Sequence, residues 1–77
     1  MPTIFREYGF RFFFYSNEGF EPMHIHVSSQ NCEAKFWMPD CELVWNYRFN
    51  AAQLRKIFEI LQENKEMITE VWDEYFG

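Results

Sequence analysis

The sequence is poor in glycine and proline, with three of each in 77 residues. Collagen-like chains and low-complexity disordered chains are rich in these residues, so the composition excludes both classes. Cysteine is also scarce, because the chain has only Cys32 and Cys41. They are too few and too far apart for a zinc ribbon or a redox Cys-x-x-Cys motif. We expect both to remain thiols in a reducing compartment.

Basic residues are scarce as well, with 7 Lys and Arg against 12 Asp and Glu and a net charge of −5 at pH 7. Broad binding to duplex DNA needs a surface rich in Lys and Arg, which this sequence lacks. No stretch approaches the ~20 consecutive apolar residues of a membrane span, and Met1-Pro2-Thr3 does not begin a secretory signal pattern. The sequence therefore predicts a cytoplasmic protein that binds neither duplex DNA nor a membrane.

Aromatic residues, in contrast, are abundant: ten Phe, four Tyr and three Trp make up 22% of the chain. A single domain of this length, residues 1–77, buries only about 60% of the surface that its unfolded chain exposes. We therefore expect several aromatic side chains to compete for too little interior, namely Phe13, Tyr15, Trp37, Trp72 and Phe76. A homodimer would cover them, most economically by packing the C-terminal helix against the neighbouring copy.

Residues 1–49 are rich in strand patterns and residues 50–76 in helix patterns, which predicts an α+β fold. Gly9, Asn17-Glu18-Gly19 and Ser29-Gln30-Asn31 supply turn chemistry between the strands. We expect a small antiparallel β-sheet of four or five strands, built from hairpins, with one long or two short C-terminal helices packed on one face. The predicted strands are Thr3–Tyr8, Phe10–Ser16, Met23–Ser28, Cys32–Met38 and Leu43–Tyr47.

The helix start has the clearest local signal. Asn50 and Gln53 form a capping-box pattern, and Phe49 and Leu54 fit a hydrophobic staple. An unbroken helix over residues 51–76 would be about 39 Å long, so it must bend, break or protrude from so small a domain. The polar run Gln62–Glu66 interrupts the apolar stripe, and Asn is a weak helix former, which favours a break into two helices near Asn64.

Both histidines of the chain lie in the segment Glu21-Pro22-Met23-His24-Ile25-His26-Val27. In a strand, His24 and His26 share one face, and their imidazoles are roughly 6 to 7 Å apart. Both could then reach one metal ion or one phosphate. Glu21 and Glu33 are the candidates for a third metal ligand, but the residues at hand form no complete zinc site, and we predict no metal and no other cofactor.

Pairing of the strands across the short loop at residues 29–31 brings further side chains to the histidine face. An antiparallel register predicts the pairs Ser28 with Glu33, His26 with Lys35 and His24 with Trp37. His24, His26 and Lys35 on one exposed face would supply the three groups that a metal-independent ribonuclease needs. These are a general base, a general acid and a cation that stabilises the charge of the phosphorane.

Tyr15 and Trp37 could stack a single-stranded RNA base beside these groups, with Glu21 and Glu33 as further binding residues. The alternative is a solvated or interface-facing sheet surface on which Lys35 balances Glu33 and no reaction takes place. The sequence leaves open whether the protein is an enzyme.

Four segments resemble a known family: Phe14–Glu18, Glu21–Val27, Ala34–Met38 and Val71–Phe76. Together they look like the bacterial family of domain of unknown function 4160, with nearly the whole chain covered. The matching motif residues are Glu21, Pro22, His24, His26, Lys35 and Trp37. Asp40-Cys41-Glu42 is more polar than the family pattern, which puts the packing of the fifth strand in doubt.

No activity is established for that family. The resemblance implies a small stand-alone bacterial protein, often encoded beside a second small protein in an arrangement like that of a toxin–antitoxin pair. We therefore expect a component of a two-gene toxin–antitoxin-like module, with a ribonuclease toxin that acts on RNA as the leading hypothesis. The alternative is a non-enzymatic module that dimerises or binds a small partner protein, and the net charge of −5 favours this alternative.

Overall fold

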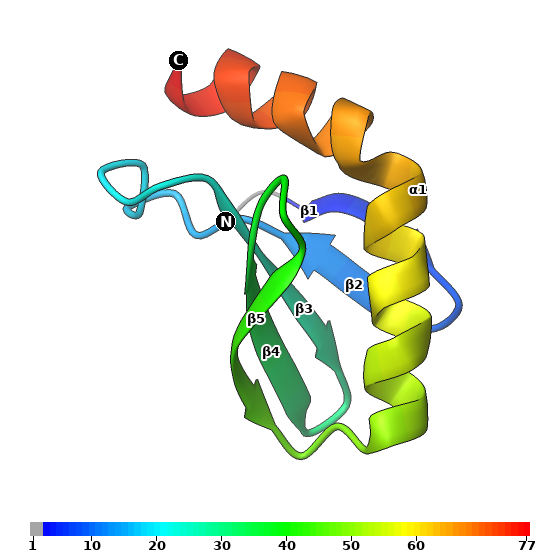
Figure 1. The fold of residues 1–77 in the computed structure, drawn as a ribbon. Coiled ribbons are helices and arrows are strands. Elements are labelled where there is room, and N and C mark those ends of the chain that lie inside the picture. Colours follow the sequence, from blue (N-terminus) through cyan, green and yellow to red (C-terminus); the bar gives the residue numbers. More distant parts are fainter. Residues whose placement is uncertain (1–2) are drawn as a thin grey trace.

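The computed structural model describes residues 3–77. It shows one antiparallel sheet of five strands in the order β1-β2-β3-β4-β5, and one C-terminal helix against a face of the sheet (Figure 1). The predicted α+β class is therefore confirmed. The elements are β1 (Thr3–Glu7), β2 (Phe10–Phe13), β3 (His24–Ser29), β4 (Cys32–Trp37), β5 (Glu42–Tyr47) and α1 (Ala51–Phe76).

Each strand pairs with the next one along the chain, so the sheet is a simple meander. Tyr8 and Gly9 join β1 to β2 with φ angles of 57° and 84°, and such positive angles are typical of tight hairpin turns. The second strand is shorter than predicted, because β2 ends at Phe13 and not at Ser16. The chain leaves the sheet there and forms the β2–β3 segment, residues 14–23, which has no regular structure.

The hydrophobic core lies between α1 and the face of the sheet that the alternation pattern predicts. Phe12, Ile25 and Val27 are fully buried on this face, and Phe12 stacks on Phe5 with ring centroids 4.4 Å apart. The core residues of the helix are Ile57, Ile60, Leu61, Ile68 and Trp72. Their spacing of three and four residues gives α1 one buried stripe and one polar face.

The helix begins as predicted and does not break. Asn50 Oδ1 accepts from the Gln53 backbone N–H at 2.8 Å, and Gln53 Oε1 accepts from the Asn50 N–H at 2.9 Å. The predicted break near Asn64 is wrong, because α1 is continuous over 26 residues and the Asn64 side chain donates to the Ile60 carbonyl within the helix. A straight helix would be about 39 Å long, which exceeds the greatest extent of the molecule, 33 Å.

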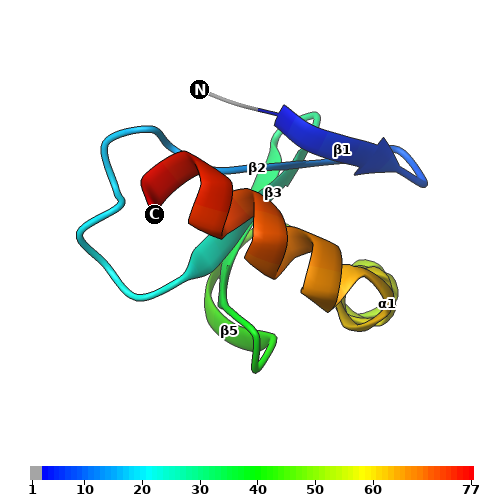
Figure 2. The same cartoon turned by 90° about the horizontal axis from the view of Figure 1, so that it is seen from above.

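The helix instead bends in its middle, so that its second half crosses the end of the sheet near the β2–β3 segment (Figures 1 and 2). A side chain at Gly19 in this segment would collide with the Phe76 ring, which shows how closely the two approach. Within residues 3–77, no helix combines the length and apolarity that crossing a membrane requires.

The opposite face of the sheet is also covered, which corrects two expectations. His24 is 0% exposed, His26 2% and Lys35 9%, so these side chains do not lie on an exposed surface. Phe13 and Trp72 are likewise buried within a single chain, with Trp72 packed against Phe14 at 5.0 Å between ring centroids. Phe13 contacts Tyr15 and His26, and Trp72 contacts Phe14 and His24, so these two residues do not need a dimer for their burial.

Candidate functional site

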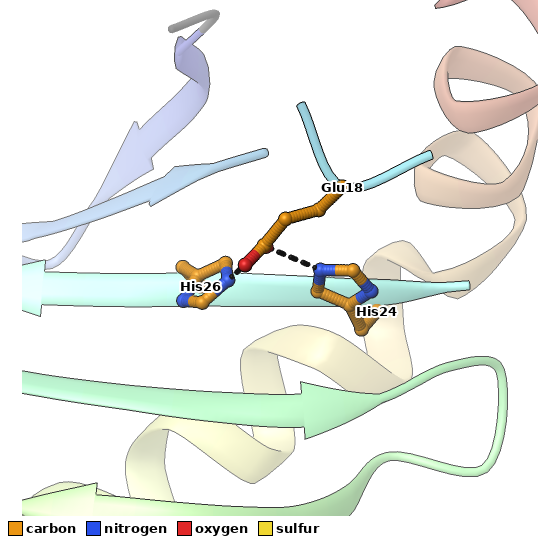
Figure 3. Close-up of side chains that lie close together, drawn as sticks. All are labelled: Glu18, His24 and His26. Carbon is orange, nitrogen blue, oxygen red and sulfur yellow. Dashed lines mark hydrogen bonds and ion pairs between the residues drawn. The ribbon is translucent and has the colours of Figure 1, made fainter. Parts of the chain in front are cut away.

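Glu18, His24 and His26 converge on the face of the sheet that points away from the core (Figure 3). Oε1 of Glu18 lies 2.8 Å from Nε2 of His24 and 2.9 Å from Nε2 of His26. The three atoms that could ligate a metal lie within 4.8 Å of one another. One carboxylate oxygen thus sits between two imidazole nitrogens.

The local fold places each of these groups. The alternation of β3 puts His24 and His26 on one face, while Ile25 between them points into the core. Glu18 comes from the β2–β3 segment, where consecutive turns bring the chain back toward the sheet. The Glu18 N–H donates to the Tyr15 carbonyl, and the Glu21 N–H donates to the Glu18 carbonyl, each at 3.2 Å.

The hydrogen bonds of His24 determine which of its nitrogens carries a proton. Nδ1 lies 2.9 Å from the carbonyl oxygen of Pro22, which can only accept, so Nδ1 is the donor. In the neutral ring Nε2 then has a lone pair, and this lone pair points at Oε1 of Glu18. Two acceptors cannot bond to each other, so a cation, either a proton or a metal ion, has to lie between them.

His26 also faces more hydrogen-bond acceptors than its neutral ring can satisfy. Nε2 faces Glu18 at 2.9 Å, and Nδ1 faces Oε2 of Glu33 at 3.3 Å without forming a hydrogen bond. A neutral imidazole has one N–H, so it cannot donate to both carboxylates. Burial lowers the pKa of His26 below its ordinary value of 6.5, although the hydrogen bond and charge of Glu18 act in the opposite direction. The neutral ring is therefore favoured at pH 7.

The pKa of Glu18 is lowered from its ordinary value. Burial alone would raise it, but the contacts with His24 and His26, whose Nε2 atoms donate to the carboxylate when protonated, outweigh that effect. The side chain of Glu18 is 25% exposed, whereas those of the two histidines are 0% and 3% exposed. Solvent and ions can therefore reach the cluster from the side of Glu18.

A second layer of polar groups surrounds the cluster. The Tyr15 hydroxyl donates to Glu33 at 3.1 Å, and Lys35 Nζ donates to Glu21 at 2.6 Å while it lies 4.9 Å from the Trp37 ring centroid. Burial and the charge of Glu33 raise the pKa of Tyr15. Both carboxylates thus lie on the Nδ1 side of the histidines, since Glu21 is 3.9 Å from Nδ1 of His24 and Glu33 is 3.3 Å from Nδ1 of His26.

The predicted pairing of β3 with β4 is confirmed: His24 pairs with Trp37, His26 with Lys35 and Ser28 with Glu33. The residues singled out from the sequence lie together, but their roles differ from the expected ones. Glu21 and Glu33 do not complete the group of ligand atoms around Nε2, and Lys35 is paired with Glu21. The missing member is Glu18, which was expected in the turn Asn17-Glu18-Gly19 and in the family segment Phe14–Glu18 but not at the histidines. The register of paired strands does not determine the position of a residue outside the strands.

Protonation of this cluster should couple to stability. We expect the metal-free protein to become less stable as the pH falls below 6.5. The pKa of His26 is lowered on folding, so the unfolded chain takes up the proton first and stability is lost as the pH falls through the folded pKa. Below the ordinary Glu18 value of 4.5, a second loss follows for the same reason.

The measurement is urea unfolding at a series of pH values in the presence of a chelator. The His26→Leu variant serves as the control, because it should lose the first of the two steps and keep the part of the second that depends on His24. Equal stability of the original protein at pH 7 and pH 5 would contradict this prediction.

Comparisons with known proteins complete the description of the site. The chain matches the model of one protein family over residues 9–73, a range that contains Glu18, both histidines and Lys35. Comparison with curated proteins found no match, and neither did comparison with solved structures. Because the match covers most of the 77 residues, the chain belongs to the family described as domain of unknown function (DUF4160).

Proposed function

We propose that the protein binds one divalent transition-metal ion, with zinc as the first choice, through Oε1 of Glu18 and Nε2 of His24 and His26. One observation carries the proposal: the Nε2 atoms of both histidines and a carboxylate oxygen meet at one point, and the other nitrogen of each ring faces an acceptor. Metal-binding histidines usually donate their second N–H to a carbonyl or a carboxylate, which fixes the ring and its tautomer. Pro22 and Glu33 occupy those positions here.

A metal ion resolves both conflicts of hydrogen bonding at once. With an ion on Nε2, Nδ1 of His24 keeps its proton for Pro22, and Nδ1 of His26 has a proton to donate to Glu33. A single proton at Glu18 can bridge its carboxylate to only one of the two Nε2 atoms. Imidazole nitrogen with one carboxylate is a donor set that suits zinc and its neighbours, whereas Ca²⁺ and Mg²⁺ prefer oxygen ligands alone.

The three ligand atoms have to rearrange to hold the ion. In a tetrahedral zinc site, metal–ligand distances of roughly 2.0–2.1 Å separate the ligand atoms by about 3.3 Å. The Glu18 oxygen is now 2.8 and 2.9 Å from the two nitrogens, which are hydrogen-bond distances. Glu18 would have to withdraw by about half an ångström, and the two nitrogens, which lie within 4.8 Å of each other, would have to settle about 3.3 Å apart. Glu18 belongs to the irregular β2–β3 segment, so its own shift does not disturb the sheet.

The ribonuclease hypothesis stays a prediction, and so do the two-gene module and the cytoplasmic location. In the metal-independent ribonuclease mechanism both imidazoles act on the RNA directly, as base and acid. Here both rings are buried and face Glu18. The arrangement therefore favours metal binding over that mechanism. Copurification with the product of a neighbouring gene would test the two-gene module separately.

Isothermal titration calorimetry with Zn²⁺ tests the metal site. We expect one ion per chain, with affinity that falls as the pH drops through the histidine range, because protons compete for the same nitrogens. Cys32 and Cys41 are free thiols and could bind zinc themselves. The titration should therefore be repeated on a Cys32→Ser, Cys41→Ser double variant, which should bind as the original protein does. No binding heat at micromolar protein and neutral pH would rule the site out.

A further inference from the structure

The last two turns of α1, residues 70–76, lie beside the β2–β3 segment (Figures 1 and 2). Trp72 is the one buried residue among them. Its ring centroid lies 5.0 Å from that of Phe14, 4.2 Å from that of Phe76 and 5.3 Å from that of His24. One aromatic side chain of the helix therefore contacts both the β2–β3 segment and a proposed metal ligand.

This end of the helix has little stability of its own. Glu70, Asp73 and Glu74 are exposed within it, and its last turn contains no basic residue. Negative charges near a helix C-terminus interact unfavourably with the partial negative charge of the backbone carbonyls there. Packing of Trp72 and Phe76 on the rest of the molecule therefore has to hold this end in place.

The β2–β3 segment meets the helix on both sides of Glu18. Before it, Phe14 packs on Trp72 and has its ring centroid 5.8 Å from that of Phe76. After it, Gly19 approaches the helix so closely that a Cβ atom at this position would overlap the Phe76 ring. The backbone next to Glu18 and the helix end therefore cannot shift independently of each other.

Side chains link the β2–β3 segment to the sheet. Two backbone hydrogen bonds, from the N–H groups of Glu18 and Glu21, shape the segment locally. The side chains of Tyr15, Glu18 and Glu21 connect it to β3 and β4. Without a metal ion, Oε1 of Glu18 faces two imidazole nitrogens that a single proton cannot both bridge. A bound ion would coordinate all three atoms and hold Glu18, and with it the segment, more firmly.

We propose that binding of this ion is coupled to docking of residues 70–76, so that the ion controls how firmly the C-terminal end of α1 is held against the sheet. The inference rests on the proposed metal site and names its regulation. The ion fixes Glu18, and the adjacent Gly19 then keeps its place against Phe76. Such coupling is reciprocal, so the docked helix end raises the affinity for the ion by the same factor.

Hydrogen–deuterium exchange of the full chain, measured by NMR with and without Zn²⁺, tests the coupling. Cys32→Ser and Cys41→Ser keep the ion from the two free thiols. The amides of Ile57 and Ile60 lie in the core and exchange through global unfolding, so bound zinc slows them whether or not the helix end is coupled. The amides of residues 73–76 should slow as well, because their opening would release the ion.

The outcomes separate this inference from the metal site itself. If zinc slows the core amides but leaves the helix end at its metal-free rate, the site is correct and the coupling is wrong. If calorimetry detects no binding and neither set of amides slows, the metal site is wrong and the coupling fails with it.

Variants test whether Gly19 and Phe76 transmit the coupling. Phe76→Ala should raise the Kd for Zn²⁺ by about fivefold or more and remove the slowing at residues 73–76. Phe58→Ala is the matched control and should change neither, because Phe58 is exposed on the first half of α1.

A double-mutant cycle tests the contact directly. Gly19→Ala should weaken zinc binding in the original chain, where the new methyl group meets the Phe76 ring, and much less in the Phe76→Ala chain. Circular dichroism checks that each variant is folded. An unchanged Kd in Phe76→Ala, or equal weakening by Gly19→Ala in both chains, would overturn the proposal.

Discussion

Saturating Zn²⁺ should raise the unfolding temperature of the protein by about 10–20 °C. A ligand that binds the folded state at a concentration 100 times its Kd stabilises it by about 2.7 kcal/mol, and each kcal/mol shifts the unfolding temperature of a domain this size by roughly 4–8 °C. The ion would connect the β2–β3 segment to β3 through Glu18, a contact that the unfolded chain cannot make. Differential scanning calorimetry with and without Zn²⁺ measures the shift.

Three variants distinguish a proposed metal ligand from a residue beside the site and from a residue far from it. Glu18→Gln should lose most of the shift, because it replaces the ligating carboxylate by a neutral amide. Glu33→Gln should bind 10–100-fold more weakly, since it replaces the charged acceptor behind His26 by a neutral amide. Glu63→Gln should keep the full shift, because Glu63 is exposed on α1. A shift that survives Glu18→Gln unchanged would place the ion elsewhere in the molecule.

The site could be predicted from the sequence only as far as the strands extend. Alternation along residues 23–28 and the short polar loop that follows fix which side chains of β3 and β4 share a face, and the observed register agrees. The position of Glu18 depends on turns in the β2–β3 segment and on the packing of Gly19 against the Phe76 ring. Neither leaves a periodic signal in the sequence, so a ligand six residues before His24 could not be assigned.

The burial of the histidines could not be predicted for a related reason. A strand with apolar residues on one side and polar residues on the other usually has one face in solvent. Here the bend of α1 brings Trp72 over β3, with its ring centroid 5.3 Å from that of His24. The capping box at Asn50 was predictable because it depends on residues three apart. The length of the helix allowed a bend, a break or a protruding end, and the choice among the three depends on how the helix packs on the rest of the molecule.

Replacing Phe12 by alanine should have the largest effect on folding. Phe12 is 0% exposed, stacks on Phe5 and meets the edge of Phe10 at 6.5 Å between ring centroids. It belongs to β2, which pairs with β1 on one side and β3 on the other, so the cavity would open in the middle of the core. Phe→Ala changes in cores cost about 3–5 kcal/mol.

That loss is comparable with the whole stability of a small domain, which is typically about 5–15 kcal/mol. Urea unfolding followed by circular dichroism should therefore show Phe12→Ala shifted to much lower denaturant, with much of the chain unfolded even in dilute buffer. Phe20→Ala is the matched control, since Phe20 is 83% exposed and its loss should change the free energy of unfolding by less than about 0.5 kcal/mol. A loss under about 1 kcal/mol for Phe12→Ala would mean that the core around β2 can close over the cavity.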